Sequence, residues 1–182
     1  MNIANQLTIL RVCIIPFFVF FMLSEGFGEY GRWIAFILFI TAAISDFFDG
    51  FLARKYNLIT NFGKFMDPVA DKLLVSSALL CFIHWQQIQT WIVIVLISRE
   101  FLIGGIRLLA IDQGVVIAAS PWGKIKTVVQ MVMILFLILN YSGYWLNIFK
   151  QILVYLSLLL AIISLVDYLR KNTHVLQEGE KR

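Results

Sequence analysis

The chain has 182 residues, of which 60% are hydrophobic and only 14% are charged. Soluble domains are nearer half apolar and a quarter charged, so this composition excludes a soluble enzyme, a disordered chain and a disulfide scaffold. The mean hydropathy of +0.86 indicates a polytopic membrane protein, and the small, scattered net charge of +4 argues against a nucleic-acid partner.

Apolar runs separated by polar and glycine-containing breaks predict an all-α integral membrane protein with six transmembrane helices. We expect residues 1–10 to form a short interfacial helix, residues 171–182 a cytoplasmic tail, and residues 1–182 a single membrane domain. In chain order, the expected spans are Leu7–Ser24, Arg32–Lys55, Gly63–Ile83, Ile88–Ile111, Pro121–Tyr141 and Asn147–Leu169.

The third and fourth spans could also be read as one. No charge falls between Leu73 and Ser98, so this stretch alone could cross a membrane. A single span would place His84 and the neighbouring glutamines at mid-bilayer, which is unfavourable. A turn at this point puts Trp85 and Trp91 at the membrane surface, where indoles are enriched, so we expect a turn.

The positions of the basic residues predict the orientation of the chain. With six spans and a cytoplasmic N-terminus, most of the 15 lysines and arginines face the cytoplasm. The opposite side receives Arg32 and Lys150, and Arg99 lies within the fourth span. Cytoplasmic loops are rich in lysine and arginine, so both termini are expected in the cytoplasm.

Four aspartates lie at the cytoplasmic ends of the second and third expected spans. Asp46 and Asp49 are three residues apart, and Asp67 and Asp71 are four apart, so each pair shares one helix face. The two helices are joined by a short loop, which predicts that all four carboxylates converge. Cations must neutralise such a cluster, and oxygen-only ligands favour Mg²⁺, Mn²⁺ or Ca²⁺ over Zn²⁺. A pair of ions there could hold a diphosphate.

Residues suited to phosphate accompany these acids. Gly50 has no side chain, so a ligand could approach the helix beside Asp49. Arg54 lies one turn further on and could bind phosphate oxygens through two parallel hydrogen bonds.

A second group of basic residues could bind an anionic acceptor. Arg107, Lys124 and Lys126 are expected at the cytoplasmic ends of the fourth and fifth spans, and Arg99 lies deeper. Their charge suits an acceptor that carries a phosphate. Membrane anchoring explains the first three residues equally well, and an internal ion pair with Glu100 explains Arg99 equally well.

The acidic motif resembles the signature of the CDP-alcohol phosphotransferase family. All fixed positions match in the run Asp46–Arg54 and in Gly63, Asp67 and Asp71. Further segments resemble the bacterial phosphatidylglycerophosphate synthase subfamily: Asn5–Arg11, Ser98–Phe101, Arg107 and Trp122–Thr127.

The resemblance implies transfer of a phosphatidyl group from CDP-diacylglycerol to glycerol 3-phosphate, with release of CMP. It implies a homodimer in the bacterial cytoplasmic (inner) membrane, whose active site faces the cytoplasm and uses two divalent cations, Mg²⁺ or Mn²⁺. In a crystal, Zn²⁺ or Ca²⁺ could occupy the same positions.

The resemblance also implies roles for individual residues. Asp46, Asp49, Asp67 and Asp71 would bind the metals, and Asp71 would also be the general base. Asn5, Thr8, Gly50, Arg54 and Thr60 would hold the nucleotide. Two alternatives stay open: the same chemistry with inositol phosphate or phosphatidylglycerol as acceptor, and a divalent-cation transporter that uses the carboxylates as an ion path.

Overall fold

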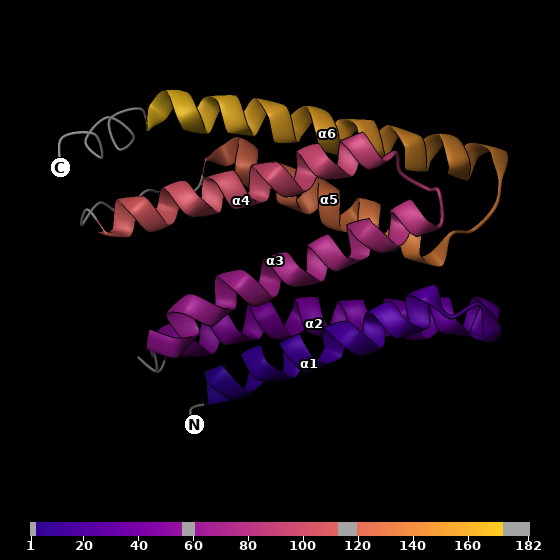
Figure 1. Ribbon diagram of the computed structural model, residues 1–182, viewed down its shortest axis with the longest axis horizontal. Helices are drawn as coiled ribbons and strands as arrows, with labels where there is room; N and C mark the ends of the chain where they lie inside the picture. Colours follow the sequence, from indigo (N-terminus) through magenta and orange to yellow (C-terminus); the bar gives the residue numbers. More distant parts are fainter. Residues whose placement is uncertain (1–2, 56–60, 113–119, 173–182) are drawn as a thin grey trace. The chain divides into compact units, whose positions relative to one another are not determined.

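The computed structural model describes residues 3–55, 61–112 and 120–172, and it describes the side chains of residues 8–45, 66, 69–110 and 120–172. Over this part of the chain all regular structure is helical (Figure 1). The elements are α1 (Ile3–Leu23), the short 3-10 helix η1 (Glu25–Phe27), α2 (Gly28–Lys55), α3 (Asn61–His84), α4 (Thr90–Asp112), α5 (Pro121–Leu139) and α6 (Tyr144–Lys171).

Each expected apolar run corresponds to one of these helices, which confirms the all-α prediction for the described residues. Within the described part of the chain, three helical stretches are long and apolar enough to cross a membrane: Glu25–Ser45, Pro121–Leu139 and Tyr144–Lys171. The stretch Thr8–Leu23 is apolar but shorter. The chain therefore has the composition and helix lengths of a membrane protein.

The expected separate helix at residues 1–10 is wrong. From residue 3 onward this segment belongs to α1, which continues without a break to Leu23 and includes Pro16. The apolar run starts close to the N-terminus, and no glycine or proline separates the lead-in from it. One continuous helix is the result.

The turn expected between the third and fourth spans is confirmed. Helix α3 ends at His84 and α4 begins at Thr90. Gln86 has a φ of 54°, a left-handed conformation that a non-glycine residue adopts mainly in turns. Asn140, in the short connection between α5 and α6, has a φ of 44° and adopts the same kind of turn conformation.

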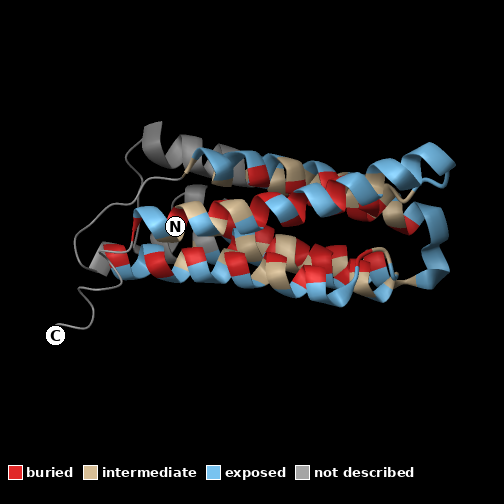
Figure 2. Ribbon diagram, turned by 90° about the horizontal axis from the view of Figure 1, so that it is seen from above, coloured by how far each residue is buried: buried red, intermediate tan, exposed pale blue. Residues whose placement is uncertain are grey.

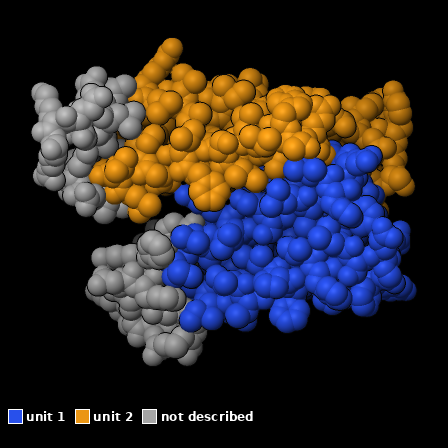
Figure 3. Space-filling view, viewed as in Figure 1, with its two compact units in different colours: residues 1–87, 138–140 blue, residues 88–137, 141–182 orange. Residues whose placement is uncertain are grey.

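The helices form two compact units, shown in different colours in Figure 3. Unit 1 comprises Met1–Gln87 with Ile138–Asn140, and unit 2 comprises Ile88–Leu137 with Tyr141–Arg182. Unit 1 therefore contains α1, α2 and α3, whereas unit 2 contains α4, α6 and most of α5. Along these helices, buried and exposed positions alternate at helical spacing (Figure 2).

Small residues allow the helices of unit 1 to pack closely. Ala35 and Ala42 in α2 are seven residues apart and fully buried, and Ala70 and Ala78 in α3 are eight apart and also fully buried. Close helix packing of this kind is typical of membrane proteins, in which the lipid provides no hydrophobic driving force between helices. A bulkier pair adds to the core, because Phe18 and Phe39 are also fully buried with ring centroids 5.8 Å apart.

Trp85 contacts both α1 and α2 at the end of unit 1 where these two helices are connected. Its indole N–H donates a 2.8 Å hydrogen bond to the carbonyl oxygen of Met22, near the end of α1. The guanidinium of Arg32, in the first turns of α2, lies 5.6 Å from the centroid of the same ring. One side chain thus joins the ends of three helices.

In unit 2, α4 packs on α6 through an apolar cluster. Ile103, Ile106 and Tyr168 are buried together, and Leu165 and Leu169 pack against them. These positions recur at helical spacing along one face of each helix. The same faces carry the polar residues described below.

Candidate active site

The four aspartates of the signature lie in two neighbouring helices of unit 1. Asp46 and Asp49 are in the second half of α2, and Asp67 and Asp71 are in the first half of α3. Because only residues 56–60 separate α2 from α3, the acid-bearing ends of the two helices face the same end of the unit (Figure 1). The backbone thus brings the two acid-bearing segments to one end of unit 1, and the convergence of the four carboxylates themselves stays a prediction.

The sequence provides four carboxylates as candidate metal ligands at this end of unit 1. The side chains of Asp46, Asp49 and Asp67 lie outside the described residues, as do Thr60, the side chains of Asn5 and Arg54, and the surroundings of Gly50. Asp71 is described and is exposed. Among the side chains described, no three His, Cys, Asp or Glu residues cluster. A set of four carboxylates without nitrogen or sulfur ligands fits hard divalent cations.

Helix α1 adds a buried polar pair to the same end of unit 1. The N-terminal part of α1 lies beside the acid-bearing ends of α2 and α3 (Figure 1). Thr8 is 1% exposed and Arg11, one turn later, is fully buried. An arginine is almost never buried completely without partners, so Arg11 is part of a polar interior. Sequence reasoning used Arg11 only for orientation and as part of a resemblance; its burial marks it as a further candidate site residue.

Unit 2 contains a buried ionic cluster that joins α4 to α5. Arg99 and Glu100 lie near the middle of α4, and Lys126 lies in the second turn of α5. The carboxylate Oε1 of Glu100 accepts hydrogen bonds from Nη1 of Arg99, at 3.2 Å, and from Nζ of Lys126. Lys126 is 1% exposed, so it is not the exposed membrane anchor that its sequence position also allowed.

Ser164 of α6 also binds Arg99. The hydroxyl oxygen of this fully buried serine accepts hydrogen bonds from Nε of Arg99, at 3.1 Å, and from Nη2, at 2.9 Å. The hydroxyl itself donates to the carbonyl oxygen of Ala161, at 3.0 Å. The sequence did not predict this contact, because Ser164 is one serine in an apolar run. The only available signal was that a charged residue inside α4 needs polar partners.

The start of α5 leaves room for the guanidinium of Arg99. A side chain at Gly123 would place its Cβ 3.3 Å from Nη2 of Arg99. Ser120 orients this turn, because its hydroxyl oxygen accepts a 3.1 Å hydrogen bond from the backbone N–H of Gly123. This is N-capping by the residue before Pro121, which itself needs no hydrogen-bond donor at the first helical position.

The other two basic candidates differ from this cluster because both are exposed. Arg107, two turns beyond Arg99 on α4, has its guanidinium carbon 6.0 Å from the centroid of the Tyr168 ring. Lys124 is exposed on the first turn of α5. Of the four basic candidates in unit 2, two are buried and share Glu100, and two are exposed.

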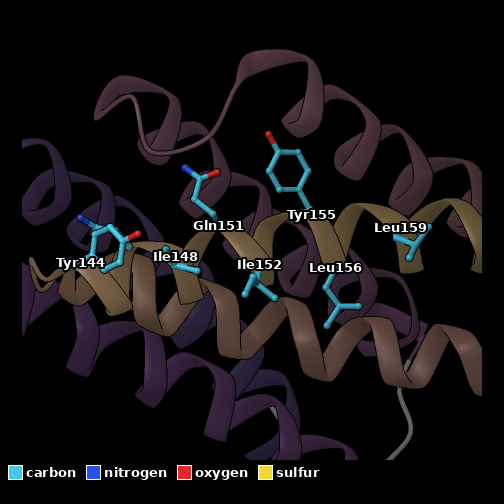
Figure 4. A pocket seen from close by; sticks show the side chains of 8 residues that line it. Tyr144, Ile148, Gln151, Ile152, Tyr155, Leu156 and Leu159 are labelled. Atoms are coloured by element: carbon cyan, nitrogen blue, oxygen red, sulfur yellow. The ribbon is translucent and has the colours of Figure 1, made fainter.

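A groove of about 640 Å³ also runs along α6, between Tyr144 and Leu159 (Figure 4). Its lining is mainly aromatic and aliphatic, all from this one helix. It contains none of the candidate site residues. Nothing in its lining suggests catalysis.

Comparison with known proteins connects these features. The family model for CDP-alcohol phosphatidyltransferase matches residues 1–163, which extend over both units. A protein of Bacillus subtilis (strain 168), named CDP-diacylglycerol–glycerol-3-phosphate 3-phosphatidyltransferase, is 39% identical over 188 residues, covering 97% of each chain. A protein of the same name from Haemophilus influenzae is 39% identical and covers 93% of this chain and 92% of its own.

A third relative comes from Mycobacterium tuberculosis (strain H37Rv). It is named probable phosphatidylglycerophosphate synthase, is 39% identical, and covers 93% of this chain and 81% of its own. The signature aspartates of α2 and α3, the helical architecture and these matches lead to one conclusion. The chain belongs to the CDP-alcohol phosphatidyltransferase family.

Proposed function

We propose that this protein transfers a phosphatidyl group from CDP-diacylglycerol to glycerol 3-phosphate, forming phosphatidylglycerophosphate and CMP in phospholipid biosynthesis. The observation that most supports this proposal is the position of the signature aspartates. They belong to two helices whose acid-bearing ends face the same end of unit 1. The names of the relatives support glycerol 3-phosphate as the acceptor. A divalent-cation transporter is a poorer explanation, since the family is one of transferases.

Two divalent cations, Mg²⁺ or Mn²⁺, would be held by Asp46, Asp49, Asp67 and Asp71. When bound, such ions stabilise the negative charge that develops on a diphosphate during substitution at phosphorus. The fit rests on the donor set, because four carboxylates suit hard cations.

The reaction itself is a substitution at the phosphorus that carries the lipid. A hydroxyl oxygen of the acceptor forms a bond to that phosphorus, and the bond from phosphorus to the CMP oxygen breaks. Asp71 takes the proton of the attacking hydroxyl, which requires an accessible carboxylate, and Asp71 is exposed. Asn5, Thr8, Gly50, Arg54 and Thr60 hold the nucleotide and so orient the leaving group.

The phosphate of the acceptor is held by Arg99, Arg107, Lys124 and Lys126. Glu100 balances one of these four cations, which leaves an excess of three positive charges for a dianion. An uncharged acceptor such as serine would gain nothing from that excess. In this arrangement Lys126 also pairs with Glu100, so the carboxylate of Glu100 is shared between Lys126 and Arg99.

The whole chain forms one membrane domain with six spans in this proposal. Both termini lie in the cytoplasm, the active site opens to the cytoplasm, and the protein is a homodimer in the bacterial cytoplasmic membrane. The distribution of basic residues supports the orientation. A bilayer location gives the lipid substrate lateral access, while glycerol 3-phosphate arrives from the cytoplasm.

The test is CMP release by the purified protein with CDP-diacylglycerol and Mg²⁺ or Mn²⁺. Glycerol 3-phosphate, inositol phosphate, serine and phosphatidylglycerol are offered separately as acceptors. We expect release with glycerol 3-phosphate alone and none with a chelator. Release only with another acceptor would overturn the acceptor assignment. No release from folded protein would overturn the reaction, and cation flux into vesicles would then be measured.

A further inference from the structure

Arg99 is fixed by hydrogen bonds from two directions. Ser164 of α6 binds Nε and Nη2, and Glu100 of α4 binds Nη1. These three hydrogen bonds occupy three of the five N–H donors of a guanidinium, so among the described residues one donor on each terminal nitrogen has no partner. These donors can bind the oxygens of a phosphate group.

The contact with Ser164 determines the plane of the guanidinium. A single oxygen that accepts from both Nε and Nη2 sets the rotation of the group about its final bond. Glu100 alone touches only Nη1 and would leave that rotation open. Binding is favoured when a side chain is already held in the binding geometry, because less rotational freedom is lost with the ligand.

We infer that Ser164 is a positioning residue, which orients Arg99 for the phosphate of the acceptor. This inference rests on the proposed function, in which Arg99 contacts that phosphate. Ser164 itself does not touch the substrate; it acts through the guanidinium. Its hydroxyl is kept in place by donating to the carbonyl oxygen of Ala161 within α6.

Unit 2 provides a matched control. Ser157 lies seven residues before Ser164, on the same face of α6, and is also fully buried. Its hydroxyl oxygen makes no hydrogen bond among the described residues. Replacing either serine by alanine removes the same atom from a buried position in the same helix, but only Ser164→Ala removes two hydrogen bonds to Arg99.

The experiment measures steady-state kinetics for both substrates with the full-length protein and its variants. We expect Ser164→Ala to raise KM for glycerol 3-phosphate about tenfold and to leave KM for CDP-diacylglycerol within about twofold. Ser157→Ala leaves both constants unchanged. Inorganic phosphate, added as a competitor of glycerol 3-phosphate, inhibits Ser164→Ala correspondingly less than wild type.

Two further variants separate positioning from packing. Ser164→Cys has nearly the same volume but a weak acceptor, so it behaves like Ser164→Ala. Ser164→Thr keeps the hydroxyl and stays within about twofold of wild type. Equal effects of Ser164→Ala and Ser157→Ala, or equal rises in both KM values, would overturn the inference.

Failure of the proposed function gives a different result. In that case neither the wild-type protein nor any variant at position 164 uses glycerol 3-phosphate as an acceptor. If Ser164→Ala does not fold, Ser164→Cys decides, since it leaves no cavity. A Ser164→Cys variant with wild-type KM for glycerol 3-phosphate overturns the inference.

Discussion

Lys126 of α5 and Glu100 of α4 form an ion pair inside unit 2, although they are 26 residues apart. Lys126 is 1% exposed, so its charge depends on this carboxylate. We expect Lys126→Met to lower the free energy of unfolding by about 3 kcal/mol, because Glu100 loses a close partner in a low-dielectric environment. Unfolding in detergent by denaturant, followed by circular dichroism, measures the change.

Lys124 is the control for this stability measurement. It lies two residues earlier on the same helix but is exposed. Lys124→Met is therefore expected to change the unfolding free energy by less than about 0.5 kcal/mol. Equal destabilisation by the two variants would contradict the structural role of the Lys126–Glu100 pair.

Replacing Asp71 by asparagine tests the general base. We expect Asp71→Asn to abolish CMP release, because an amide cannot take the proton of the acceptor hydroxyl. The side chain is exposed, so the fold is retained. Melting temperature and turnover are measured together, and Asp167→Asn, which affects an ion pair with Lys171 in α6, serves as an active control. An active, folded Asp71→Asn protein would refute the assignment.

Removal of divalent cations tests the carboxylate site as a whole. Incubation with a chelator is expected to stop CMP release, and addition of Mg²⁺ or Mn²⁺ to restore it. Asp46→Asn and Asp49→Asn should each weaken metal binding, because an amide is a weaker ligand for hard cations. Half-maximal activation should therefore need a higher concentration of Mg²⁺ or Mn²⁺. Full activity in the chelator would show that no metal is required.

Substitutions of Tyr168 test the role of Arg107, whose guanidinium lies over the tyrosine ring. The cation–π contact predicts that Tyr168→Leu raises KM for glycerol 3-phosphate by about fivefold, the effect of losing roughly 1 kcal/mol of orientation energy. Tyr168→Phe keeps the ring and is expected to behave like wild type. Its lost hydroxyl is buried without a hydrogen-bond partner among the described residues. A large effect of Tyr168→Phe would contradict this explanation.

Trp85 allows stability and activity to be separated. Trp85→Phe removes the hydrogen bond to Met22 and weakens the contact with Arg32. We expect the free energy of unfolding to fall by about 1 kcal/mol. Turnover should not change, because Trp85 lies at the end of α3 opposite Asp67 and Asp71. A thermal melt with a CMP-release assay checks both expectations.

The helices and their breaks were largely predictable from the sequence. The turn after His84 and the start of α5 at Pro121 follow from local chemistry: polar and aromatic residues at one break, and a proline after a capping serine at the other. The separate helix at residues 1–10 was predicted wrongly. Polarity alone suggested a boundary there, but a helix continues through polar residues, and no glycine or proline lies between residue 3 and residue 10.

Within one helix, spacing determines which side chains share a face, so the sequence by itself determined the pairing of Asp46 with Asp49 and of Asp67 with Asp71. Contacts between helices have no such rule. Only the tertiary structure decided that Lys126 is buried against Glu100 and that Ser164 holds Arg99. The reason is physical: a buried charge takes whatever polar group helix packing brings within about 3 Å, and that choice depends on residues far apart in the chain.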